Sequence, residues 1–195
     1  MAKPKNRGGV DRERRKRQAT SRGPRPRTTS ASNDAWGRSR HGAQAARGFH
    51  YQDMVGAWLA ARVLAGDLRL THITPEGLED LSCEGDDGAE LQAKSRQQRI
   101  GPFTPSDVTD FIIEGWSKAV TYQTTHKPWV LVLERQIRGC PIAVPSPGTS
   151  LSAGSAPRDL TERLRSKWEA IGAPAPIDDM LTRTSLYVCD QEWLE

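Results

Sequence analysis

At 195 residues, the chain is expected to form one domain plus a tail. Only 36% of the residues are hydrophobic, a low share for a globular protein, which indicates that part of the chain does not fold. No run approaches about eighteen apolar residues and no apolar signal-peptide core follows the start, so the composition excludes a membrane-spanning segment and predicts a cytoplasmic protein.

Positive charge is concentrated at the N-terminus. Residues 1–47 contain 14 Lys or Arg and three acidic residues, although the formal net charge of the whole chain is only +4. Residues 48–195 therefore hold 14 basic and 21 acidic residues, a net charge of −7. The basic character belongs to the N-terminal segment, and the part expected to fold is acidic.

Residues 1–43 are expected to be a disordered basic tail. Runs such as residues 12–17 (RERRKR) and 22–27 (RGPRPR) contain no large apolar side chain and cannot bury a core. Such a segment can act as an electrostatic arm on phosphate backbones. A solvated tail, an Arg/Ser-rich targeting peptide and an extension from a wrongly assigned start are the alternatives.

The folded part begins with a helix predicted over residues 44–64. Its apolar residues recur near the 3.6-residue spacing and predict one buried face, made of Phe49, Val55, Trp58, Leu59 and Val63. Strands are predicted over residues 68–73, 78–83 and 89–95. The last two are joined by the turn Gly85-Asp86-Asp87-Gly88, because glycine supplies positive φ and aspartate tolerates it.

A second helix is marked at its start by Thr104-Pro105 or Ser106 as the cap. Its buried face is predicted to hold Val108, Phe111, Ile112, Trp116, Ala119 and Val120. After Lys127-Pro128, the continuous apolar run over residues 129–133 predicts a central strand covered on both faces.

The rest of the chain predicts a long loop, a helix and a strand. Residues 135–157 are rich in Pro, Gly and Ser, which is typical of a loop. A helix is predicted over residues 157–170, and a last strand over residues 185–189. The apolar residues of that helix are Leu160, Leu164, Trp168 and Ile171. The element order predicts an α/β sandwich with a small central sheet.

Cysteine and histidine give no sign of a metal cluster. Cys83, Cys140 and Cys189 lie far apart, so they are expected to be ordinary core or surface residues in a reducing compartment. The four histidines form no metal-binding pattern either, and a structural zinc site is not expected.

Residues 75–96 carry the candidate chemistry. Mg²⁺ prefers oxygen ligands, and in phosphodiester cleavage it neutralises charge and lowers the pKa of a bound water. Asp80 is the expected main ligand, with the Gln92 amide oxygen and the Ala93 main-chain carbonyl as further ligands. Glu79 would point to the opposite face if both acids lay in a strand. Lys94 shares a strand face with Gln92, from which it can orient the attacking water or hold the phosphate.

A solvated hairpin with a charged outer face is the competing interpretation. In that interpretation, Lys94 only neutralises the charge of Glu90 or Asp80. The site is favoured because the residues lie on consecutive strands between two helices, and because Gln92 and Lys94 share a face with Glu90.

The order αβββαβ with an acid followed by Gln-x-Lys resembles the PD-(D/E)xK restriction-endonuclease-like superfamily, in its QxK variant. More narrowly, residues 48–52 (GFHYQ), 76–80 (EGLED) and 91–94 (LQAK) resemble the nuclease domain at the N-terminus of bacterial anti-phage effectors, such as the CD-NTase-associated endonucleases. The resemblance covers residues 44–135. It implies a restriction-endonuclease-like αβββαβ core within a nuclease domain over residues 44–195.

The resemblance implies a Mg²⁺- or Mn²⁺-dependent endonuclease that cleaves double-stranded DNA in antiviral defence. It places Asp80, Gln92 and Lys94 at the centre of the site, with Glu79 or Glu76 as an additional acid. Gln52, on the first helix, is a candidate accessory residue where relatives of the superfamily often have an acid. Gln92 is a departure from the usual acid, and the loss of that charge is expected to weaken metal binding.

Partners follow from the same resemblance. Effectors of this branch carry a sensor domain after the nuclease, so we expect a sensor domain or partner protein, and a homo-oligomer when active. Arg96 and Arg99 are candidate contacts to a phosphate backbone, or else solvated loop residues. The alternative function is a non-catalytic nucleic-acid-binding protein with a degenerate nuclease fold and a basic tail.

Overall fold

The computed structural model describes residues 30–140, 149–153, 156–190 and 194, with side chains from residue 45 onward. Residues 42–195 form one compact unit, and the fold described below is that of this unit. Residues 1–29, which make up most of the expected tail, lie outside the described residues.

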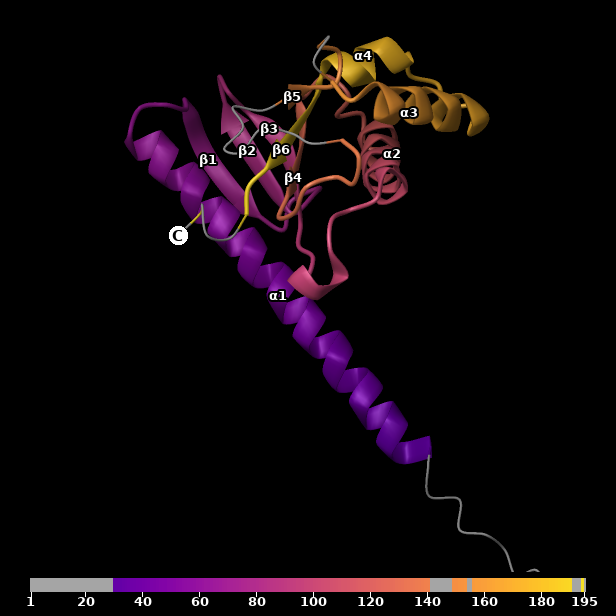
Figure 1. The fold of residues 1–195 in the computed structure, drawn as a ribbon. Helices are drawn as coiled ribbons and strands as arrows, with labels where there is room; N and C mark the ends of the chain where they lie inside the picture. Colours follow the sequence, from indigo (N-terminus) through magenta and orange to yellow (C-terminus); the bar gives the residue numbers. More distant parts are fainter. Residues whose placement is uncertain (1–29, 141–148, 154–155, 191–193, 195) are drawn as a thin grey trace, which may run out of the picture. The chain divides into compact units, whose positions relative to one another are not determined.

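Six strands form one mixed sheet in the order β1-β2-β3-β4-β6-β5 (Figure 1). Strands β1 to β3 are antiparallel, β3, β4 and β6 are parallel, and β5 pairs antiparallel with β6. The strands are β1 (Leu70–Pro75), β2 (Leu81–Gly85), β3 (Ala89–Lys94), β4 (Trp129–Leu133), β5 (Thr149–Ser150) and β6 (Thr184–Val188). The carboxyl ends of β3, β4 and β6 share one edge of the sheet, where α/β proteins bind their ligands.

Helices flank this sheet, as the sequence predicts. They are α1 (Ser30–Leu64), α2 (Pro105–Thr121), α3 (Arg158–Ala170) and α4 (Ile177–Thr182), with a short 3₁₀ turn, η1 (Gln98–Ile100). The predicted start of α2 is confirmed. Thr104 accepts a hydrogen bond from the Asp107 amide, and Asp107 accepts one from the Thr104 amide, which together form a capping box.

Each face of the sheet has its own core. Against one face, Tyr51, Val55 and Leu59 of α1 pack on β2, β3 and β4. Against the other, α2, α3 and α4 pack on β4 and β6 (Figure 1). Strand β4 contributes Val132 to the first core and Leu131 to the second, which confirms the prediction of a central strand covered on both sides.

The first helix differs from its prediction in two respects. It begins at Ser30 rather than near Gln44, so residues 30–43 of the expected tail are helical. Phe49, placed on the buried face by its spacing, is 57% exposed, whereas Tyr51 is buried and donates a hydrogen bond to the Cys189 carbonyl (2.7 Å). Two residues correspond to about 200° around a helix, so Phe49 points away when Tyr51 faces the sheet.

Four further differences lie in short segments. The second predicted strand begins at Leu81 and not at Leu78. Strand β5 lies within the predicted loop over residues 135–157, and α4 precedes β6 without having been predicted. Ile171 is 51% exposed because α3 ends at Ala170, one residue before it.

The cysteines behave as predicted for core residues. Cys83, Cys140 and Cys189 are buried and free, and burial raises the pKa of the Cys189 thiol to about 11. No helix within the described part of the chain has the length and apolar character needed to cross a membrane.

Candidate active site

The site begins with a tight turn over residues 76–80. Glu76 adopts positive φ (55°), and its amide donates to the Asp80 carbonyl (2.9 Å). Gly77 is required here, since a Cβ at this position would lie only 2.7 Å from the Cβ of Ser82. Strand β1 ends at Pro75 and β2 begins at Leu81, so Glu79 and Asp80 lie in the turn and not in a strand.

Asp80 is fixed from both sides. Its Oδ2 accepts a hydrogen bond from the Ala93 amide (2.7 Å), just beyond the last paired residues of β2 and β3, Leu81 and Leu91. Its main-chain carbonyl accepts from Nε2 of Gln52 on α1 (2.7 Å). Gln52 therefore lies beside the site and contacts Asp80 through the main chain.

Glu79 is the main correction to the predicted geometry. It does not point to the opposite face, because both acids lie in the turn rather than in a strand. The side chain is buried, and its Oε2 accepts hydrogen bonds from Gln92 Nε2 (3.1 Å) and Lys118 Nζ (3.4 Å). Glu79 and Gln92 therefore meet on the α2 side of the sheet.

Two buried oxygens of this pair have no partner. Glu79 Oε1 and Gln92 Oε1 accept no hydrogen bond from any described residue. A buried polar atom without a hydrogen-bond partner costs about 1–3 kcal/mol of folding stability. Native proteins therefore rarely leave two such atoms on residues that contact each other. A cation is one group that satisfies both.

Gln92 and Lys94 lie on the α2 face of β3, while Leu91 and Ala93 pack toward α1, as predicted. The Lys94 ammonium lies 5.2 Å from the ring centre of Phe111 on α2. Among the described residues it has no hydrogen-bond or ion-pair partner in the site or outside it. A lysine held by a ring alone can still bind a phosphate oxygen.

The competing view of Lys94 as the counter-ion of Glu90 is wrong. Glu90 is buried at the other end of β3, where its two carboxylate oxygens accept hydrogen bonds from Ser82 Oγ (2.6 Å) and Lys127 Nζ (2.8 Å). Its carboxylate is therefore satisfied without Lys94.

The Ala93 main chain faces the site. Glu90 donates through its amide toward β4, and Lys94 accepts there from the Glu134 amide, so the even-numbered residues of β3 bond to β4. In a parallel pair, the odd-numbered residues then turn both amide and carbonyl to the other side, toward β2. The Ala93 carbonyl thus lies on the side of Asp80, as a metal ligand requires.

Burial raises the pKa of the Glu79 carboxyl group above its usual value. The charge and hydrogen bond of Lys118 oppose this rise, and so does the charge of Lys94. The charge of Asp80 adds to the rise. The net direction is upward because desolvation exceeds the attraction of the lysines. A second cation at the site would favour the ionised form.

The donor set fits a hard divalent cation. No group of three or more His, Cys, Asp or Glu gathers within the described residues. Mg²⁺, however, needs only one or two carboxylates because it keeps several waters. Glu79 and Asp80 supply two carboxylates, and Gln92 adds an amide oxygen. Glu79 Oε1 and Gln92 Oε1 have no hydrogen-bond partner among the described residues.

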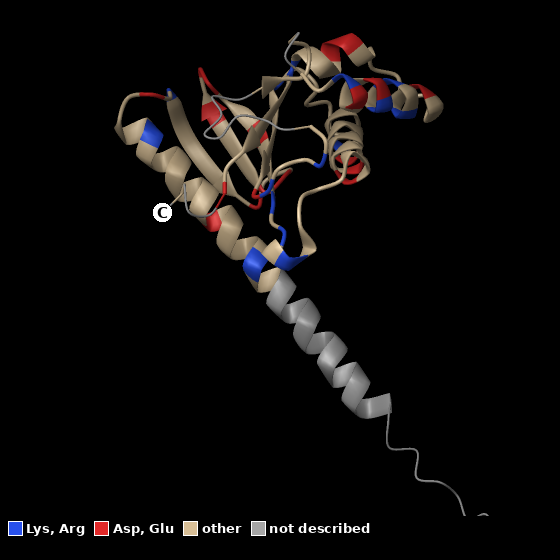
Figure 2. Ribbon diagram, in the orientation of Figure 1, with Lys and Arg blue, Asp and Glu red and all other residues tan. Residues whose placement is uncertain are grey.

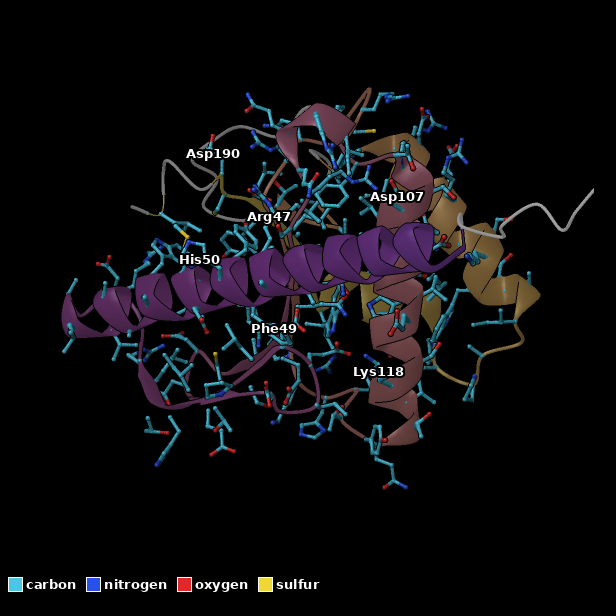
Figure 3. All side chains as sticks on the ribbon, turned by 90° about the horizontal axis from the view of Figure 1, so that it is seen from below. Arg47, Phe49, His50, Asp107, Lys118 and Asp190 are labelled. Carbon is cyan, nitrogen blue, oxygen red and sulfur yellow. The ribbon has the colours of Figure 1, made fainter. Side chains whose placement is uncertain are left out.

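Lys118 is the site residue that sequence reasoning missed. It projects from α2 (Figure 3) and shares its ammonium between Glu79 (3.4 Å) and Glu114 (3.2 Å). It follows Phe111 by seven residues, about two helical turns, so the two face the same way. That spacing was readable in the sequence, but only once Phe111 was known to face Lys94.

The remaining predicted residues lie around the site. Glu76 is exposed in the turn. Arg96 is engaged within the protein: its guanidinium pairs with Asp107 (2.8 Å) and lies 4.4 Å from the Phe103 ring centre. Arg99 is exposed, and its side chain hydrogen-bonds only to its neighbour Gln97 (2.7 Å) among the described residues, so it is the freer of the two arginines to meet a phosphate.

Charges of both signs meet beside this edge of the sheet. Figure 2 shows basic residues on α1 and on the connection between β3 and α2, near acidic residues at the strand ends. Comparison with known proteins adds no assignment: no protein-family model matches the sequence, and neither a curated protein nor a solved structure matches it significantly.

Proposed function

We propose that the chain is a Mg²⁺- or Mn²⁺-dependent endonuclease with a restriction-endonuclease-like core. The observation that carries the proposal is the pair of unpartnered buried oxygens, Glu79 Oε1 and Gln92 Oε1, beside Asp80 and Lys94. The αβββαβ order and the resemblance of the Asp80, Gln92 and Lys94 spacing to the QxK nucleases support it.

The residues divide the work by their chemistry. Asp80, Glu79 and Gln92 would hold the metal through oxygen, with the Ala93 carbonyl as a further ligand. A bound Mg²⁺ supplies charge neutralisation at the phosphodiester and activates water. Lys94, whose ammonium has no acidic partner among the described residues, orients the attacking water or binds a phosphate oxygen.

Double-stranded DNA is the proposed substrate and phage defence the proposed setting, both on the strength of the resemblance. The basic segment of residues 1–47 supports a polyanionic partner, because Lys and Arg bind phosphate backbones without regard to sequence. A sensor domain or partner protein, oligomerisation when active and a cytoplasmic location belong to the same proposal.

The test is cleavage of supercoiled and linear plasmid by the purified full chain with Mg²⁺ or Mn²⁺. Lys94→Ala and Asp80→Ala are expected to lower the rate by about 10²–10³-fold, the range seen when one group that stabilises a transition state is removed. Lys127→Ala is the matched control, because this lysine pairs with Glu90 away from the site.

Two results would contradict the nuclease. One is the absence of cleavage with either metal at protein concentrations high enough for self-association. The other is equal cleavage by the unchanged protein and both site variants.

One observation favours the alternative, a non-catalytic nucleic-acid-binding protein. Lys118 already neutralises part of the charge of Glu79, and Gln92 brings no charge of its own. This alternative predicts DNA binding that weakens steeply with salt and after removal of residues 1–29. It also predicts that Lys94→Ala leaves binding unchanged.

A further inference from the structure

Glu134, the residue directly after β4, is the most deeply buried carboxylate at the carboxyl edge of the described sheet, with 1% of its surface exposed. We propose that Glu134 is a positioning residue that holds Lys94 in its working orientation. The proposal rests on the nuclease function proposed above and concerns the same site.

The carboxylate and the amide of Glu134 make their hydrogen bonds to the end of β3 and to α1. Its Oε2 accepts from Ser95 Oγ (2.8 Å) and from the Arg96 amide (2.7 Å), and its Oε1 accepts from Nη2 of Arg47. Its own amide donates to the Lys94 carbonyl (3.0 Å). Glu134 therefore binds the chain at Lys94 and at both residues that follow it.

This clamp acts at the carboxyl end of β3, in addition to the pairing of Lys94 with Leu133 of β4 and the ion pair of Arg96 with Asp107. Lys94 is the last residue of the strand, and its ammonium touches only the Phe111 ring among described side chains. No ion pair with a described residue fixes the direction of the side chain, so its direction follows from the main chain beneath it. Releasing Ser95 and Arg96 would let that main chain move.

Arg47 connects the clamp to the metal-binding acid. Its Nε donates to Ser95 Oγ (3.1 Å) while its Nη2 binds Glu134. Gln52, five residues further along α1, holds the Asp80 carbonyl. The same helix therefore sets the positions of Lys94, through Arg47 and Ser95, and of Asp80, through Gln52. In Figure 3, Arg47 and the exposed Phe49 project from opposite sides of α1.

Glu90 offers a matched control for a merely structural carboxylate. It is buried to a similar degree on the same strand pair, and it also accepts from one serine and one cation, Ser82 and Lys127. It lies at the opposite end of β3. Loss of stability alone would therefore act alike at both carboxylates, whereas loss of Lys94 orientation would follow only from Glu134.

The experiment compares Glu134→Gln with Glu90→Gln, and Ser95→Ala with Ser82→Ala, in steady-state cleavage of a defined duplex with Mn²⁺. Glu134→Gln is expected to lower kcat by about 10–100-fold, since a misplacement of about 1 Å can cost 10²-fold, with KM changed less than about threefold. Ser95→Ala, which removes a single donor, is expected to lower kcat by about 3–10-fold. Both controls are expected to keep kcat within about threefold.

Thermal unfolding of each variant establishes the folded fraction, and Ser95→Ala decides the matter if Glu134→Gln does not fold. Equal loss of kcat in both members of a pair, or a change confined to KM, would overturn the positioning role while leaving the nuclease intact. Absence of cleavage by the unchanged protein would instead overturn the nuclease, and this inference with it.

Discussion

Glu79 and Glu134 are two buried glutamates near the same edge of the sheet, and their surroundings are opposite. Both oxygens of Glu134 accept hydrogen bonds, three in all, from an arginine, a serine and a main-chain amide. Glu79 has one oxygen with no donor among the described residues, and its other oxygen accepts from the Gln92 amide at 3.1 Å and from the Lys118 ammonium at 3.4 Å. Burial alone therefore does not distinguish the two acids, whereas the unsatisfied oxygen of Glu79 does.

Glu90 shows which of the two is the ordinary case. It is buried like the others, and each of its oxygens has a donor within the protein. Among the described glutamates that are buried, only Glu79 departs from full pairing. A protein that satisfies two such groups and leaves the third unsatisfied keeps the third available for a ligand.

The largest expected effect distinguishes Arg47, the counter-ion of Glu134, from Lys118, the counter-ion of Glu79. Arg47→Met leaves Glu134 buried and without its cation, which costs about 3 kcal/mol of unfolding free energy, the lower end of the range for broken buried pairs. Lys118→Met is expected to cost about 1 kcal/mol, because its ammonium lies 3.4 Å from Glu79 and is shared with Glu114, and because Glu79, whose pKa burial raises, can take up a proton when the lysine is lost. Urea unfolding measures both, and similar losses would remove the distinction.

The next effect is stabilisation by metal. Mn²⁺ at about one hundred times its dissociation constant is expected to raise the unfolding free energy of the unchanged protein by about 2.7 kcal/mol. Glu79→Gln and Asp80→Asn are expected to lose this gain, while Glu134→Gln and Glu90→Gln keep it. A gain that disappears equally in all four variants would mean that the metal does not bind at Glu79 and Asp80.

The smallest expected effect is a gain of stability without metal. The raised pKa of Glu79 means that folding favours its protonated form. Its favourable contribution is therefore complete below the unfolded-state pKa and lost as the pH rises through the folded-state pKa. Glu79→Gln, which resembles the protonated form, should be more stable than the unchanged protein at neutral pH.

The measurement is metal-free unfolding over a series of pH values. The advantage of Glu79→Gln should shrink as the pH falls through the raised pKa. A constant difference, or a variant that is less stable at every pH, would contradict the assigned direction.

Local signals in the sequence predicted most of the fold. The capping residues of α2, the apolar run of β4 and the Gly85–Gly88 turn each act over a few residues, and all three lie where they were expected. The choice of Asp80, Gln92 and Lys94 also depended on short spacings within one hairpin, and the structure places the Asp80 carboxylate against the amide of Ala93, the residue between Gln92 and Lys94.

The parts that escaped prediction depend on distant contacts. Glu79 turns toward Gln92 because Gly77 lets the chain approach Ser82, a contact that no periodicity reveals. Lys118 lies 39 residues from Glu79, and Arg47 lies 87 residues from Glu134. The two cations that distinguish the glutamates could therefore be recognised only after the helices had been placed on the sheet.

Lys118 has a further consequence for the exchange of cations at this site. Its ammonium is bound by Glu114 on its own helix as well as by Glu79. If the proposed metal ion binds Glu79, Lys118 keeps Glu114 as an anionic neighbour. The affinity of Glu79 for the metal ion would then reflect the difference between two interactions, the one with the metal ion and the one with Lys118. This affinity should be sensitive to ionic strength.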